Sequence, residues 1–330
     1  MSCRHGVQCT ETECLYSPSH WSASLKSPDL VIKTFITAMK SCYQNNQRTI
    51  SLQQAIPYGD GKQRIDIWGD EIESTTAMVL FHGGYWQEGD RELFTSPVKA
   101  LIDKGFVVAS VGYDFATVIS LNNVIDQATK ALSFLAKRWP WKKLAVGGHS
   151  AGAHLVISAL KRLEDAYRYQ KIVLFSGIYD LQPLVGTYIG EPINLSFDEA
   201  KRFSIISMEE ISAELLVIVG GDESPQFKEQ SQQIVQNYLE AHHFDKTTAY
   251  YKVATVPPVM KTRRTDKTQS STEYVPVEKE EDSFAKKTPV KRLAKRSIEI
   301  RSKAPVDRER EDYKTFSGIK LPMSDADLDK

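Results

Sequence analysis

The chain has 330 residues, 41% of them hydrophobic, and its 42 basic and 42 acidic residues leave no net charge at pH 7. This composition supports a core of ordinary size and argues against a protein built as a whole to bind nucleic acid or an anionic membrane. No apolar run reaches the roughly 18 residues of a transmembrane helix. The first 21 residues contain no signal-peptide core, so we expect a cytoplasmic protein without membrane or nucleic-acid partners.

Three of the four cysteines, Cys3, Cys9 and Cys14, lie near the N-terminus, and the fourth is Cys42. Their spacings match no paired zinc-ligand pattern such as C-x2-C, and His5 alone does not complete one. Without a secretory signal, a disulfide framework is not expected either. The spacing therefore predicts reduced thiols in a frayed N-terminal segment, and no metal site.

Short apolar runs alternate with helical patterns through the first 253 residues. These runs predict strands over residues 64–68, 77–82, 106–113, 143–148, 172–176, 215–220 and 247–253. The helical patterns between them predict helices over residues 92–104, 121–138, 151–163 and 225–239. Such alternation predicts an α/β fold with a mostly parallel sheet covered by helices, whose chemistry lies at the carboxyl ends of the strands.

The composition changes sharply near residue 253. Residues 254–330 carry 18 basic and 14 acidic residues, so 42% of this stretch is charged, against 21% of the chain before it. With few large aliphatic residues, the tail cannot bury enough apolar surface to offset its ordering entropy. We predict three parts: an N-terminal segment (1–28), the α/β domain (29–253) and a charged tail of low order (254–330).

The sequence Gly148-His149-Ser150-Ala151-Gly152 stands between a predicted strand and an apolar helix. This is the G-x-S-x-G pattern, in which a sharp turn lifts the serine hydroxyl out of the sheet. The helix that follows directs its first backbone N–H groups at a developing oxyanion. The pattern in this context predicts Ser150 as a nucleophile, the alternative being a serine in a tight glycine turn.

A second loop, His82-Gly83-Gly84-Tyr85-Trp86, also follows a predicted strand. Glycine-rich segments at this point donate backbone N–H groups to an oxyanion hole. We predict donors from Gly83 or Gly84, together with the N–H of Ala151. His82 is interpreted as a structural residue that pins the loop, with a place in the substrate pocket as its alternative, while Tyr85 and Trp86 are either pocket walls or core.

The triad acid should follow a later strand, in the chain order serine, acid, histidine. Asp222 stands directly after the apolar run 215–220 and is the predicted acid, whose task is to orient a histidine. Glu223 is the neighbouring alternative. Asp222 could instead cap the helix that begins near Pro225.

These motifs together resemble kynurenine formamidase, an arylformamidase of the α/β-hydrolase superfamily. The resemblance covers roughly residues 14–253 and rests on HGGYW (82–86), GHSAGAHL (148–155), SGIYDLQPLVGTYI (176–189), GGDESPQF (220–227) and YSPS (16–19). It implies an α/β-hydrolase fold and hydrolysis of N-formyl-L-kynurenine to L-kynurenine and formate in tryptophan degradation. It implies a small-molecule substrate and no metal or organic cofactor, with Ser150 attacking the formyl carbonyl and Tyr85, Trp86 or Tyr179 facing the aromatic ring. Whether the chain is a monomer or a homodimer stays open.

The chain departs from the family at the catalytic histidine, which the resemblance places just after the last core strand. No histidine follows His243, and His242 and His243 come before that strand, at the wrong edge of the sheet. Three accounts stay open: a joined gene model, a splice form or fusion without activity, or a rearranged site served by another histidine. Without a base, turnover should fall by about 10^6.

Two other functions stay open: a carboxylesterase for short acyl groups, and a ligand-binding relative without turnover. The tail adds a run with six basic residues in eleven, 286–296, which is either a nuclear-import signal or, as we favour, a solvated linker of mixed charge.

Overall fold

The computed structural model describes residues 3, 5–25, 27–242 and 249–254, the last six by their backbone. The predictions for the tail, including its low order and its basic run, lie outside these residues. In chain order the elements are α1 (Glu11–Leu15), α2 (Pro28–Thr49), β1 (Leu52–Pro57), β2 (Arg64–Trp68), β3 (Thr76–Phe81), α3 (Val98–Ile102), β4 (Phe106–Val111), α4 (Leu121–Arg138), β5 (Lys143–His149), α5 (Ala151–Leu160), β6 (Tyr169–Phe175), α6 (Phe197–Phe203), β7 (Glu214–Gly220), α7 (Pro225–Ala241) and β8 (Ala249–Ala254).

The described strands form one sheet in the order β1-β2-β4-β3-β5-β6-β7-β8. From β4 to β8 all neighbours are parallel, while β1 and β2 are antiparallel additions at one edge. The predicted α/β-hydrolase fold is therefore confirmed, and each predicted strand is present with its ends moved by a few residues. The sequence analysis missed β1, a short strand with mostly exposed side chains at the sheet edge.

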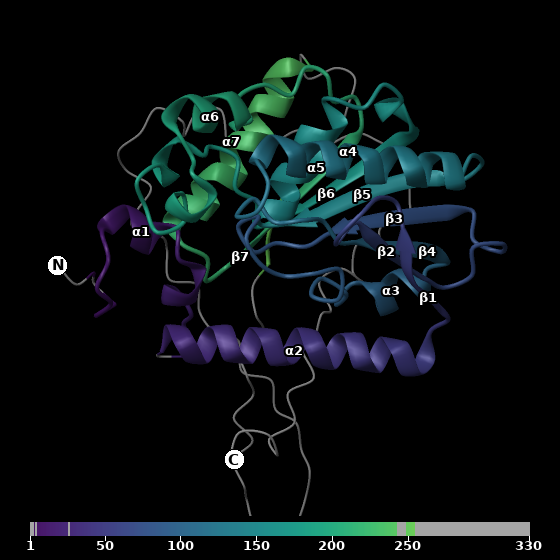
Figure 1. The fold of residues 1–330 in the computed structure, drawn as a ribbon, viewed down its shortest axis with the longest axis horizontal. Coiled ribbons are helices and arrows are strands. Elements are labelled where there is room, and N and C mark those ends of the chain that lie inside the picture. The colour runs from purple at the N-terminus through teal and green to yellow at the C-terminus, as the bar shows by residue number, and fades with distance from the viewer. Residues whose placement is uncertain (1–2, 4, 26, 243–248, 255–330) are drawn as a thin grey trace, which may run out of the picture. The chain divides into compact units, whose positions relative to one another are not determined.

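Helices α4, α5 and α7 cover one face of the sheet, and α2 and α3 lie on the other (Figure 1). The prediction for α4 is confirmed to the residue, because its apolar positions recur at helical spacing and all turn inward. The predicted helix 92–104 is wrong over its first half. The helix α3 covers only Val98–Ile102, with Pro97 at its N-cap, and turns occupy the residues before it.

The long helix α2 was not predicted because its buried side is narrow. Its buried residues are Met39, Tyr43 and Asn46, whereas Leu30 and Ile32 are more than 40% exposed. Such a mixture of exposed and buried apolar residues carries little helical periodicity in the sequence. Proline at the first helical position still marks where the helix begins.

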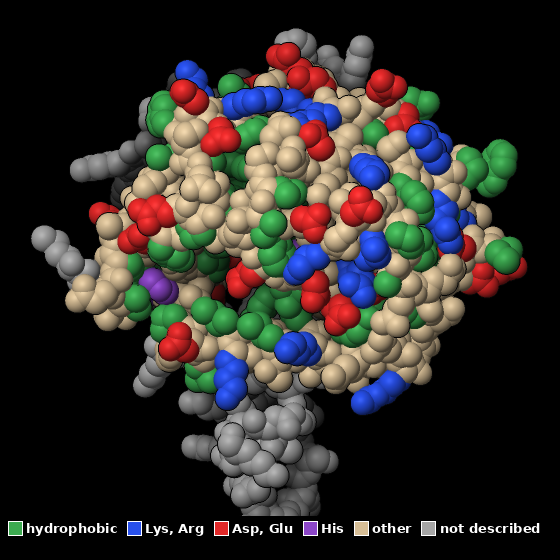
Figure 2. All heavy atoms as spheres, viewed as in Figure 1, with side chains coloured by type: hydrophobic (Ala, Val, Ile, Leu, Met, Phe, Trp, Pro, Cys, Tyr) green, Lys and Arg blue, Asp and Glu red, His purple; other side chains and the backbone are tan. Residues whose placement is uncertain are grey.

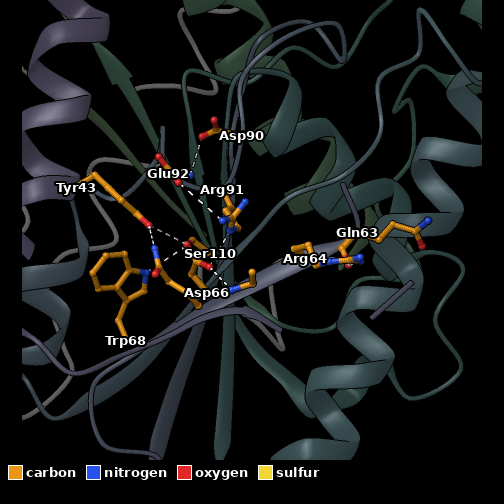
Figure 3. Close-up of polar contacts among 11 residues, drawn as sticks. Tyr43, Gln63, Arg64, Asp66, Trp68, Asp90, Arg91, Glu92 and Ser110 are labelled. Carbon is orange, nitrogen blue, oxygen red and sulfur yellow. Dashed lines mark hydrogen bonds and ion pairs between the residues drawn. The ribbon is translucent and has the colours of Figure 1, made fainter. Parts of the chain in front are cut away.

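A buried ion pair ties α2, the edge strands and the loop after β3 together (Figure 3). Asp66 on β2 is fully buried, and its Oδ1 lies 2.7 Å from Arg91 Nε and 2.7 Å from the Ala55 amide, which both donate to it. The Tyr43 hydroxyl donates to Asp66 Oδ2 at 3.3 Å. A buried carboxylate with three donors is fully compensated, so this network holds Arg91 and the loop before it in one position.

A cavity of about 270 Å³ lies beside this ion pair, bordered by Arg91, Arg64 and Tyr113. Ser150 is not among its lining residues. The cavity therefore lies apart from the predicted nucleophile.

Acidic and basic side chains alternate over the face shown in Figure 2, in keeping with the absence of net charge. None of the helices in the described part of the chain has the length and apolarity to cross a membrane.

Candidate active site

The predicted nucleophile lies in a strained turn between β5 and α5. Ser150 has φ 54° and ψ −119°, a left-handed conformation that a residue with a side chain adopts only when its surroundings hold it there. The Ser150 amide donates to the Phe175 carbonyl at 2.9 Å, and the Ala153 amide donates to the Ser150 carbonyl at 2.9 Å. These bonds anchor the turn to β6 on one side and to α5 on the other.

The two outer glycines of the turn are required by packing. A Cβ on Gly148 would lie 2.3 Å from the Gly152 carbonyl oxygen, and a Cβ on Gly152 would lie 2.3 Å from the Phe81 carbonyl oxygen. Because each clash is with backbone, no rotamer change could relieve it. The absence of side chains at both positions lets the start of α5 pack directly on the end of β3.

The loop after β3 lies against the nucleophile. A Cβ on Gly83 would lie 3.0 Å from Ser150 Cβ and 2.9 Å from the His149 carbonyl oxygen. Gly84, Tyr85 and Trp86 all have positive φ, so this loop curls tightly across the strand end. Strain concentrated in two adjoining loops is typical of a functional site.

Three backbone N–H groups of these loops, those of Gly83, Gly84 and Ala151, donate to no acceptor in the described part of the chain. Ala151 is the first residue of α5, so the positive end of the helix dipole strengthens the attraction of its N–H for an anion. Unpaired donors next to a serine hydroxyl are what an oxyanion hole requires. The structure thus brings Gly83 and Ala151 together with Ser150, and Gly84 follows Gly83 in the same loop.

His82 is buried behind this loop. Its ring stacks on Tyr113 with centroids 4.2 Å apart, and its Nδ1 donates to the Gly83 carbonyl at 2.7 Å. Burial lowers its pKa to about 4, against an opposing contribution from that hydrogen bond. A neutral imidazole that pins its own loop is the structural role predicted for His82.

The two histidines that flank the serine are also engaged elsewhere. His154 Nε2 donates to the Phe203 carbonyl at 2.8 Å, and its ring lies edge-on to Trp86. The His149 ring packs against Phe35 and Phe94. Burial lowers the pKa of each to about 4. Neither side chain hydrogen-bonds to Ser150 in the described residues.

Two carboxyl groups follow β7. Asp222, the predicted acid, is exposed, and its Oδ2 accepts from the Ala23 amide at 3.4 Å. Glu223 is partly buried, and Ser176, at the end of β6, hydrogen-bonds its carboxyl. Burial raises the pKa of Glu223 above its ordinary value, while that hydrogen bond and Lys228 oppose the rise. The cap of α7 is supplied by Ser224 and not by Asp222.

His242 is the described histidine nearest to β8 in the sequence. It lies at the edge of the sheet where the parallel strands begin, opposite to the edge that carries Ser150 and Asp222. His242 ends α7 and packs on Tyr238, whose hydroxyl donates to the Ala213 carbonyl just before β7 begins. The seven residues of β7 span about 20 Å. His242 is therefore about that far from Asp222, as predicted, and His243 lies outside the described residues.

The aromatic residues predicted as pocket walls are mostly core. Trp86 is wholly buried, which favours the core alternative, and Tyr179 is 3% exposed. The Tyr179 hydroxyl lies against Gly177 and has no hydrogen-bond partner in the described part of the chain. Tyr85 is half-buried, and its hydroxyl donates to the Tyr16 carbonyl.

The sequence analysis gave the N-terminal segment no role in the site, yet the segment contacts it at several points. Besides the Tyr85–Tyr16 bond, Gln230 donates to the Tyr16 hydroxyl at 2.8 Å, and the Ser17 and Tyr188 hydroxyls are 2.6 Å apart. The YSPS motif (16–19) was the available signal. Within the described residues, side chains grouped closely enough to bind a metal lie in this segment and not beside Ser150.

Comparisons with known proteins agree with this geometry. The BD-FAE family model matches residues 65–194, which include the loop after β3 and the serine turn. The chain is 30% identical to a kynurenine formamidase of Danio rerio over 237 residues, or 68% of this chain and 80% of the relative. It is 31% identical to a kynurenine formamidase of Salmo salar over 242 residues, which cover 67% of this chain and 80% of that relative.

Solved structures resemble the fold. A crystal structure described as a putative thioesterase from Silicibacter sp. superposes with a TM-score of 0.60 at 24% identity, over 74% of this chain and 91% of that one. The HSL homologue EstE7 from a metagenome library superposes with a TM-score of 0.54 at 14% identity, over 74% and 86%.

Proposed function

This chain belongs to the kynurenine formamidase family, and on that premise we propose that it hydrolyses aryl formamides of the N-formyl-L-kynurenine type to the aryl amine and formate. The relatives at about 30% identity bear the name of that activity. The BD-FAE family model matches residues 65–194, which include the loop after β3 and the serine turn. An aryl formamide is also the substrate class that the resemblance of the motifs to kynurenine formamidase implies.

In this proposal the Ser150 oxygen attacks the formyl carbon, and the carbonyl oxygen becomes an oxyanion held by the N–H groups of Gly83, Gly84 and Ala151. Collapse breaks the C–N bond and releases the aryl amine with the proton from Ser150. Water then hydrolyses the formyl ester, returning the serine hydroxyl and releasing formate. One oxyanion donor is worth about 3–4 kcal/mol of barrier in comparable enzymes.

The observation that carries the proposal is the strained Ser150 turn lying against Gly83, with unpaired N–H groups at both loops. Backbone strain of this kind costs about 1–3 kcal/mol, which a purely structural serine would not need. A serine held out of the sheet beside free donors is suited to acyl transfer.

The general base is the missing part. No histidine follows β8 in the sequence. His82 and His154 hydrogen-bond to backbone carbonyls, and the His149 ring packs on Phe35 and Phe94 without a hydrogen bond to Ser150 in the described residues. Removing the triad histidine costs about 10^6 in turnover and leaves about 10^3–10^4 over water. We propose that this chain works at that residual level unless a base is supplied.

The orienting carboxylate, predicted as Asp222, is assigned in this proposal to Glu223. The Glu223 side chain is partly buried at the strand-end edge beside Ser176, whereas Asp222 is exposed and accepts from the N-terminal segment. A carboxyl in a desolvated position interacts more strongly with a neighbouring imidazolium than an exposed one does.

The test is hydrolysis of N-formyl-L-kynurenine by the purified full chain, with Ser150→Ala as the inactive variant and Ser158→Ala as its matched control. Ser158 is also buried, lies two turns further along α5 and contacts His154 instead of the oxyanion loop. Without an added base, all three proteins should share the slow residual rate, because loss of the serine costs little once the histidine is absent. With imidazole supplied as the base, we expect faster turnover in the unmodified chain and in Ser158→Ala but not in Ser150→Ala. Equal rates in all three proteins with imidazole present would overturn the nucleophile assignment.

A second candidate, binding without turnover, is favoured by the same missing histidine. Saturable binding of the formamide with no Ser150-dependent product would support it. A short-acyl ester used beside the formamide distinguishes a third outcome, since a carboxylesterase would turn over the ester alone.

A further inference from the structure

The fold of the N-terminal segment brings together four side chains of types that bind metals, although their spacing in the sequence matches no paired zinc-ligand pattern. The ligand atoms of this cluster all lie within 4.8 Å of one another, and its members are Cys3, His5, Cys14 and His20. The His5 Nδ1 and Cys14 Sγ atoms are already 3.2 Å apart. We propose that this N-terminal Cys2His2 cluster binds one zinc ion.

Short, well-defined backbone turns bring the cluster together. A turn closed by the Cys3 amide on the Val7 carbonyl, 2.7 Å, folds the start of the chain back, and Gly6 takes the positive φ of 77° that this turn needs. Helix α1 then presents Cys14. A 3-10 turn (Pro18–His20) brings the last ligand round.

Local bonds hold these turns in place. Thr10 and Glu13 form a capping box at the start of α1, with both reciprocal bonds present. The Trp21 indole donates to the Cys14 carbonyl at 2.9 Å, and its ring lies edge-on to His5 at 4.8 Å. The cluster is therefore walled on one side by an indole, which limits access of water.

The spacing of the ligand atoms suits a tetrahedral ion. Zinc bonds of about 2.3 Å to sulfur and 2.0 Å to nitrogen place tetrahedral ligand atoms roughly 3.3–3.8 Å apart. A cluster whose widest pair is within 4.8 Å needs a contraction of about 1 Å to reach that geometry. Two thiolates and two imidazoles are zinc ligands, whereas magnesium and calcium require oxygen ligands.

A polar atom without a partner also points to a ligand. His20 Nδ1 is buried and has no hydrogen-bond partner in the described residues, and Cys14 beside it is 4% exposed. A buried nitrogen left unpaired is costly, and a metal bond would satisfy it.

A zinc ion at the cluster would fasten the segment that reaches the candidate active site. The chain next to Cys14 supplies the Tyr16 carbonyl to Tyr85 and the Ser17 hydroxyl to Tyr188. Zinc binding itself does not depend on hydrolysis, so it can be tested whether or not the proposed function holds.

The experiment uses the full chain, purified under reducing conditions, stripped with a chelator and titrated with zinc against a chromophoric chelator. We expect one zinc ion per chain. Cys14→Ser and His20→Gln should each weaken binding at least 100-fold, and Cys42→Ser, a thiol on α2 outside the cluster, should leave it unchanged. Cobalt bound in place of zinc should show the thiolate charge-transfer absorption of a tetrahedral site with sulfur ligands.

Two results of the zinc titration would overturn the proposal: no zinc bound above the level in Cys14→Ser, or equal weakening by Cys42→Ser. A stable disulfide between two N-terminal cysteines in the reduced preparation, detected by a mass two hydrogens lower, would also overturn it. If Cys14→Ser does not fold, Cys3→Ser, at the start of the chain, provides the same comparison.

Discussion

The ends of β5 and β7 lie on one edge of the sheet with β6 between them, but they are built differently. At the β5 end, Ser150 is held at positive φ by backbone contacts that leave no room for a Cβ on Gly148 or Gly152. At the β7 end, Asp222 is exposed and Glu223 has one carboxyl oxygen without a partner in the described residues. The nucleophile is thus set by close packing, whereas neither carboxyl group at the β7 end is held by close packing of this kind.

The two ends also differ in the direction of their pH dependence. Around the β5 end, burial lowers the pKa of His82, His149 and His154 to about 4. At the β7 end, burial raises the pKa of Glu223. As the pH falls, the histidines oppose folding because the unfolded chain takes up their protons first, while a carboxyl with a raised pKa favours the folded state.

The largest expected effect comes from acidification. Between pH 7 and pH 5, a histidine whose pKa is near 6.5 unfolded and near 4 folded lowers the free energy of unfolding by about 2 kcal/mol, so His82, His149 and His154 together account for about 6 kcal/mol. Urea unfolding at the two pH values measures this, and His82→Gln should remove about a third of the difference. A free energy of unfolding that stays level or rises between pH 7 and pH 5 would show that Glu223, at the β7 end, outweighs the histidines.

The next effect is on the packing of the serine turn. Gly152→Ala places a Cβ against the Phe81 carbonyl, and we expect the free energy of unfolding to fall by about 3 kcal/mol. Gly105→Ala is a control without a packing clash: nothing lies within 4 Å of its Cβ, so only the strain of its positive φ of 81°, about 1–2 kcal/mol, applies. Equal losses in thermal or urea unfolding would mean that close packing is not what distinguishes the β5 end.

A smaller effect tests whether the base alone is missing. Imidazole added to the buffer should raise Ser150-dependent turnover of the formamide about tenfold or more, since a positioned general base contributes about 10^2–10^4. The Ser150→Ala protein in the same buffer provides the background rate. If imidazole accelerates the unmodified protein and Ser150→Ala equally, Ser150 is not the nucleophile.

The smallest effect separates the two carboxyl groups. Glu223→Gln removes a buried carboxyl with a raised pKa, so we expect a gain of up to about 1 kcal/mol in stability at pH 7 and a weaker rescue by imidazole. Asp222→Asn should change neither, because that side chain is exposed. A loss of rescue in Asp222→Asn, and not in Glu223→Gln, would return the orienting role to Asp222.

The sequence by itself determined the parts of the molecule that neighbouring residues specify. The α4 bounds, the core strands and the meeting of Ser150 with Gly83 all follow from local periodicity and from glycines beside strand ends, because parallel strands bring their carboxyl ends to one edge. The missing histidine is likewise plain from the sequence.

Only the tertiary structure decided what depends on distant partners. The exposure of Asp222, the burial of Glu223 and the long helix α2 each reflect contacts between segments far apart in the chain. The N-terminal cysteines and histidines look unrelated by spacing, yet two turns and a short helix place them together. The spacing of two residues in the sequence predicts their distance in space only within one helix or strand. For residues on different elements, the distance depends on how the elements pack, which no local sequence pattern shows.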